Sequence, residues 1–184
     1  GRIPVAAGWR RQDMVDNASP AYAGHLTLGA DPRLAQRVRD ADVLLVVGER
    51  LSEITTAGYT LLRVPNPAQA LIHVTPDPDE LGRVYAPTLA VPASPDSFAL
   101  ALAATAPLDG SRWEDAFRSA RDDYLENLGH PPAPGELDMG EVMAVLRDRL
   151  PDDAILTNGA GNFSVWTHRF YEFRRYPTQL APTS

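Results

Sequence analysis

The fold is decided by the stretch Ala41-Asp42-Val43-Leu44-Leu45-Val46-Val47-Gly48-Glu49-Arg50, in which the five apolar residues 43–47 are followed by a glycine. Similar runs lie at 3–7 and 71–74, and a weaker one lies at 89–91. Short apolar runs without polar alternation are typical of strands that are buried on both faces, as in parallel sheets. The sequence therefore predicts strands in these four segments.

Helices are predicted between and after these strands. Residues 31–39 begin with an aspartate that can cap a helix and a proline suited to its first turn. Ser94 is expected to start a helix that includes 98–104, and Ser111 to cap another over 112–128. This β-α-β alternation predicts an α/β fold, a Rossmann-like open parallel sheet with helices on both faces rather than a barrel.

A proline-rich segment at 129–135, Gly-His-Pro-Pro-Ala-Pro-Gly, cannot continue a helix and has the composition of a stiff connector. Beyond it we expect a helix over 139–150, a strand over 154–157, a tight turn over 158–162 and a helix over 163–173. This second α/β unit reads as truncated, because no further strands follow to complete a sheet. The expected domains are therefore 1–107, a helix and connector at 108–135, and 136–184.

The composition excludes several classes of protein. The 184 residues contain no cysteine, which excludes a disulfide, a thiolate metal site and a cysteine nucleophile. No stretch approaches the roughly 18 apolar residues of a membrane span, so no membrane partner is expected and cytoplasm is the default location. The net charge of -7 argues against a nucleic-acid partner. All 17 basic residues are arginine, which excludes Schiff-base chemistry and a lysine-dependent phosphate loop within the chain.

The turn at 158–162 is the first candidate site. A glycine-rich turn between a strand and a helix can bring backbone N–H groups and a helix N-terminus onto an anionic phosphate. The alternative is a tight turn without a ligand, because Gly159-Ala160-Gly161 is not the full dinucleotide fingerprint.

The second candidate is the end of the strand at 43–47, where Gly48 could approach a nucleotide and Arg50 could hold its phosphate. The alternative is an ordinary turn in which the arginine pairs with a nearby acid at the surface.

The four histidines are too scattered for a metal site, and His73 is expected to be a satisfied core or strand-end residue. Two polar clusters, 13–17 and 77–80, could line a cleft but are more often turn and capping residues. No catalytic residue and no metal ligand is predicted.

Several phrases together resemble the thiamine-diphosphate enzymes related to acetolactate synthase. The segments 4–24, 41–51 and 71–83 resemble parts of the central domain of that family, and the resemblance is strongest at 71–83. Residues 155–166 are similar to the opening of its diphosphate-binding domain, where Trp166 aligns with a family tryptophan. Gly161 and Asn162 then take positions that lie at the diphosphate end of the cofactor. The resemblance implies backbone contacts from Gly161, Asn162 and Phe163.

The same resemblance implies an enzyme that needs more than this chain. Its catalytic glutamate would lie upstream of Gly1, and its Mg²⁺-binding motif downstream of Ser184. It also implies the remaining domains of the same polypeptide as partners, and a homo-oligomer, a dimer or tetramer. Gly48 and Arg50 fall on positions where relatives bind FAD, ADP or nothing.

The expected function is that of a fragment of a thiamine-diphosphate-dependent lyase or carboligase acting on 2-oxo acids, inactive alone and architectural in role. The alternative is a stand-alone Rossmann-type nucleotide-binding module. A third hypothesis is an interaction scaffold without a ligand.

Overall fold

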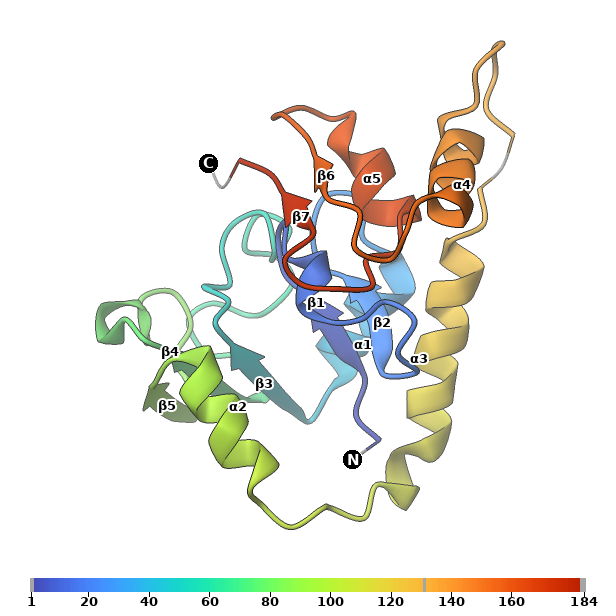
Figure 1. The fold of residues 1–184 in the computed structure, drawn as a ribbon. Helices are drawn as coiled ribbons and strands as arrows, with labels where there is room; N and C mark the ends of the chain where they lie inside the picture. The colour runs from blue at the N-terminus through green and yellow to red at the C-terminus, as the bar shows by residue number, and fades with distance from the viewer. Residues whose placement is uncertain (1, 131, 183–184) are drawn as a thin grey trace. The chain divides into compact units, whose positions relative to one another are not determined.

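The computed structural model describes residues 2–130 and 132–182. Gly1, Pro131, Thr183 and Ser184 lie outside the described residues, so the expected connector and the end of the second α/β unit are described only in part. The described chain divides into two compact units, which are treated separately: unit 1 comprises residues 35–109, and unit 2 comprises residues 2–34 and 110–182. Figure 1 shows the elements of both units.

Unit 1 contains a parallel three-stranded sheet in the order β3 (Val43–Val47), β4 (Ala70–Thr75) and β5 (Leu89–Pro92). These strands confirm three of the four that were predicted. Because β4 is the central strand, its Leu71 and Val74 are fully buried. The β3 side chains Val43, Leu45 and Val47 are 38–55% exposed, so one side of this edge strand is open. The short helix η2 (Pro78–Glu80) follows β4, and α2 (Pro95–Ala103) follows β5 and packs against β4.

The predicted helix starts depend on side-chain caps. Ser94 Oγ accepts the amide of Ser97 at 3.2 Å, which confirms the start of α2. Asp31 Oδ1 accepts the amide of Arg33 at 2.8 Å and so caps α1 (Pro32–Asp40). The prediction for Ser111 is wrong, because it lies inside the 3₁₀ turn η3 (Ser111–Trp113) and α3 (Glu114–Asn127) begins beyond it.

In unit 2, the predicted strand β1 (Val5–Ala7) pairs in parallel with β2 (Tyr22–His25). All four residues of β2 are buried, and α3 packs against this strand, as Figure 1 shows. The Tyr22 and Tyr124 rings meet edge to face with centroids 4.9 Å apart. Beside them Ala23, Leu34 and Ala120 form a second buried cluster.

The C-terminal part of unit 2 contains the two helices and the strand that were predicted, in the predicted order, and a further strand, β7 (Gln179–Leu180), that was not predicted. The predicted elements are α4 (Met139–Arg149), β6 (Leu156–Thr157) and α5 (Ser164–Phe170). β6 and β7 pair in parallel, and α4 packs against α5. The helix expected over 163–173 is shorter than predicted, because α5 ends at Phe170.

Polar residues from the start of the chain fasten this C-terminal part within unit 2. Asp13, in η1 (Gln12–Met14), accepts the amides of Thr178 and Gln179 through Oδ2 at 2.9 and 3.0 Å. Asn17 Oδ1 accepts the amide of Phe173 at 2.9 Å, and Asn17 Nδ2 donates to two nearby carbonyls. These residues are therefore structural, as turn and capping residues usually are.

Among the described residues, no helix combines the length and apolar character that a membrane span needs.

Candidate functional site

The turn between β6 and α5 holds three of the five predicted site residues. The strand is fixed by the amides of Leu156 and Asn158, which donate to the carbonyls of Thr178 and Leu180 at 2.8 and 3.2 Å. Gly161 then has a φ of +140°, and an added Cβ would lie 2.8 Å from Cε1 of Phe163. Both the backbone angle and the ring require glycine at this position.

The carbonyl of Gly161 is hydrogen-bonded, whereas the amides of residues 161–163 are not bonded to any described residue. Ser164 is buried and donates to the Gly161 carbonyl through both its amide and its Oγ, at 3.1 and 2.8 Å. Among the residues that the structure describes, none receives a hydrogen bond from the amides of Gly161, Asn162 and Phe163. All three residues are exposed, Phe163 by 58%. The turn thus presents three consecutive unbonded donors at the start of α5.

The other two predicted residues lie in unit 1, at the end of β3. Gly48 has a φ of +71°, and its amide donates to the carbonyl of Val74 at 2.8 Å. Arg50 Nη2 donates to Glu80 Oε1 at 2.9 Å from an exposed position. Hydrogen bonding from Arg50 lowers the pKa of the Glu80 carboxyl. The geometry here is that of a turn with a surface ion pair, which was the alternative expectation.

His73 is a buried residue, as predicted, but it is satisfied only in part, because its Nδ1 has no hydrogen-bond partner in the described part of the chain. Its ring is buried on β4, and Nε2 lies 2.9 Å from the carbonyl of Glu49. The cluster after β4 is also local, because Asp77 accepts the amide of Asp79 at 3.0 Å and caps η2. In the described part of the chain, no group of three or more histidine and acidic side chains could hold a metal ion.

Sequence reasoning missed a buried polar cluster around Arg10 in unit 2. Arg10 is buried, its guanidinium lies 4.3 Å from the Trp9 ring, and its Nη1 donates to the carbonyl of Pro182. Trp9 in turn meets His168 edge to face at 5.4 Å. Burial, and secondly the charge of Arg10, lowers the pKa of His168 to about 4. Burial likewise lowers the pKa of His25 to about 4, helped by His168. No local sequence signal connects these residues.

Comparison with known proteins agrees with this α/β architecture. The sequence model described as "Thiamine pyrophosphate enzyme, central domain" matches residues 1–102. The chain therefore belongs to the family of thiamine pyrophosphate enzymes.

Two curated relatives match over most of the chain. A sulfoacetaldehyde acetyltransferase of Rhodobacter capsulatus is 25% identical over 202 residues, which cover 97% of this chain and 34% of the relative. An acetolactate synthase isozyme 2 large subunit of Escherichia coli is 25% identical over 166 residues, which cover 90% of this chain and 29% of the relative. The chain thus spans about a third of the length of either relative.

Proposed function

We propose that this chain is a segment of a cytoplasmic thiamine-diphosphate-dependent lyase or carboligase of the acetolactate synthase type, acting on 2-oxo acids. Family membership and the names of the two relatives, an acetyltransferase and an acetolactate synthase, support this proposal. In it, residues 1–107 serve as a central domain, 108–135 as a connector, and 136–184 as the start of the diphosphate-binding domain. The role of the segment is architectural, and it does not turn over substrate alone.

The observation that carries the proposal is the row of free amides at Gly161, Asn162 and Phe163. Unbonded N–H groups on an exposed turn are donors that suit the oxygens of a diphosphate, and a glycine allows the ligand to come close to the backbone. These three residues would hold the diphosphate end of the cofactor. Bound thiamine diphosphate supplies the carbon nucleophile of the reaction.

The protein's own contribution at this turn is to bind and orient. Ser164 donates to the Gly161 carbonyl, and the pairing of β6 with β7 holds the residues before the turn, so both ends of the turn are held in place. The described residues offer no cluster of carboxylates for Mg²⁺. In the proposed enzyme we assign the Mg²⁺ ligands to other domains of the same polypeptide, which forms a homodimer or homotetramer.

Amide-resolved NMR tests the site directly. Adding thiamine diphosphate with Mg²⁺ should shift the amide signals of Gly161, Asn162 and Phe163, and inorganic pyrophosphate should shift the same three signals. Gly161→Ala should abolish both effects, whereas the matched control Gly159→Ala should keep them, since its added Cβ would meet only the Phe163 ring at 3.7 Å. Shifts that avoid residues 161–163 would refute the site.

The absence of turnover is tested separately. The purified chain, supplied with pyruvate, thiamine diphosphate and Mg²⁺, should release no carbon dioxide above the level without protein. Sustained release would show that the segment is catalytic and contradict the architectural role.

The nucleotide-binding alternative predicts a different response. FAD or ADP would have to act at Gly48 and Arg50, where the glycine amide already donates to Val74 and the arginine pairs with Glu80. We expect no shift of these two amide signals on adding either nucleotide. A saturable shift there would favour a dinucleotide-binding module.

A further inference from the structure

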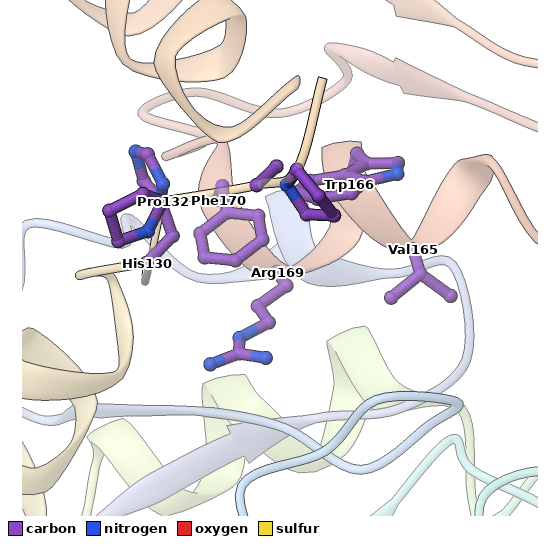
Figure 2. A pocket seen from close by; sticks show the side chains of 8 residues that line it. His130, Pro132, Val165, Trp166, Arg169 and Phe170 are labelled. Carbon is purple, nitrogen blue, oxygen red and sulfur yellow. The ribbon is translucent and has the colours of Figure 1, made fainter. Parts of the chain in front are cut away.

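A pocket of about 330 Å³ opens in unit 2 beside α5. Residues 132–134 and the helix α5 both line it, and Figure 2 shows Pro132 beside Phe170. Ligand sites typically measure about 300–1,000 Å³, so this pocket suits a ligand near the lower limit. Its lining consists of His130, Pro132, Ala133, Pro134, Val165, Trp166, Arg169 and Phe170.

Flat rings form the interior of the pocket. Trp166 and Phe170 are stacked, with centroids 5.5 Å apart and planes inclined by 28°. The His130 ring meets Phe170 edge to face at 5.8 Å. Stacked rings facing prolines form a slot that favours another planar group, because such a group buries the most apolar area in it.

The proline wall is fastened to the rest of unit 2. Asp138 Oδ2 accepts the amide of Ala133 at 3.0 Å, while its Oδ1 accepts the amide of Gly140 at 2.8 Å. The Ala133 hydrogen bond is the main reason that the pKa of the Asp138 carboxyl is lowered. Gly140 leaves room for the His130 ring, because an added Cβ would collide with it. The slot therefore has two fixed walls.

Arg169 gives the pocket a positive charge. Its guanidinium carbon lies 4.8 Å from the centroid of the Phe170 ring, and in Figure 2 the side chain extends past that ring. Within the described residues, the buried Nε of Arg169 has no hydrogen-bond partner. A buried donor without a partner costs free energy until an acceptor satisfies it. Arginine is also the side chain whose geometry best matches a carboxylate.

We propose that this pocket binds a small planar carboxylate. Its ring enters the slot between the prolines and the Trp166–Phe170 stack, and its carboxylate accepts hydrogen bonds from Arg169. The pocket uses residues other than Gly161, Asn162 and Phe163, so this site is additional to the proposed cofactor site and takes a different ligand.

Benzoate is the probe that tests both parts of the site. The indole N–H signal of Trp166, assigned by its loss in Trp166→Phe, should shift saturably as benzoate is added to the full chain. Benzamide keeps the ring without the charge, and acetate keeps the charge without the ring. Each should bind at least about tenfold more weakly than benzoate, since a hydrogen bond to a charged group or a buried ring contributes that much.

Two variants and one control complete the test. Arg169→Gln should weaken benzoate binding about tenfold, whereas Arg118→Gln, the same change on an exposed side chain of α3, should leave it unchanged. Ala133→Leu fills the slot without altering charge and should abolish binding. The amide spectrum of each variant outside the pocket must match that of the wild type. Equal binding of benzamide or acetate, unaltered binding to Arg169→Gln or Ala133→Leu, or no shift with benzoate would overturn the proposal.

Discussion

Acidification should destabilise unit 2 through His25. His25 is 4% exposed, and burial, aided by the positive charges of His168 and Arg169, lowers its pKa from 6.5 to about 4. A hydrogen bond with the backbone of Leu28 opposes this shift. The folded protein therefore keeps the ring neutral at pH values where the unfolded chain has already bound a proton.

The magnitude follows from the gap between the two pKa values. Because the folded pKa is the lower one, the contribution of His25 to stability is complete above about 6.5 and is lost as the pH falls to about 4. Each pKa unit corresponds to about 1.4 kcal/mol, so the full loss is about 3 kcal/mol, of which about 2 kcal/mol is lost by pH 5. His168 should add to the loss in the same direction, since its pKa is also lowered to about 4.

Urea denaturation followed by tryptophan fluorescence measures this effect selectively. Trp9, Trp113 and Trp166 all lie in unit 2, as His25 does. Between pH 7.5 and 5, the free energy of unfolding of His25→Gln should fall by about 2 kcal/mol less than that of the wild type. The Asn17→Ala variant, destabilised without losing a histidine, should keep the pH dependence of the wild type. Parallel pH profiles for wild type and His25→Gln, or a His25 ring that titrates near 6.5 by NMR, would refute the reasoning.

Three further changes have definite expected outcomes. Gly161→Ala should lower the free energy of unfolding by about 1–3 kcal/mol, because a φ of +140° is strained for alanine, and Gly159→Ala should have a smaller effect in the same urea titration. Asn17→Ala should cost about 3 kcal/mol by tryptophan fluorescence, because it leaves the buried amide of Phe173 unsatisfied; a loss below about 1 kcal/mol would contradict that role. Arg50→Gln should change the melting temperature, followed by circular dichroism, by no more than a few degrees, since it removes an exposed ion pair worth at most about 1 kcal/mol; a larger drop would show a structural role.

The sequence predicted the elements whose signals are local. The runs at 43–47 and 71–74 became β3 and β4, as their apolar residues predicted. The expected burial holds for the central strand β4 but is wrong for β3, an edge strand with no buried residue. The starts of α1 and α2 followed from Asp31 and Ser94, which satisfy amides within three residues along the chain. Such interactions do not depend on the rest of the fold, so the sequence suffices to place them.

Interactions between distant segments could not be predicted in the same way. β2 lacks both an apolar run and alternation, and it is a strand because β1 and α3 bury it. The position of His25 near His168 depends on how β2 and α5 meet, which neither segment indicates alone. The pocket beside α5 was missed for the same reason, since Ala133 and Arg169 come together only through the fold.

The two candidate turns show why a glycine after a strand is a weak indicator of a phosphate site. Gly48 and Gly161 both follow strands and both have positive φ, so the local sequence treats them alike. Their amides differ: that of Gly48 completes the pairing of β3 with β4, whereas that of Gly161 has no partner among the described residues. A phosphate needs donors that the fold has not already used, because displacing a backbone hydrogen bond would cancel much of the gain from binding. The state of the amide, which only the fold determines, therefore decides whether a turn still has a donor for the proposed phosphate.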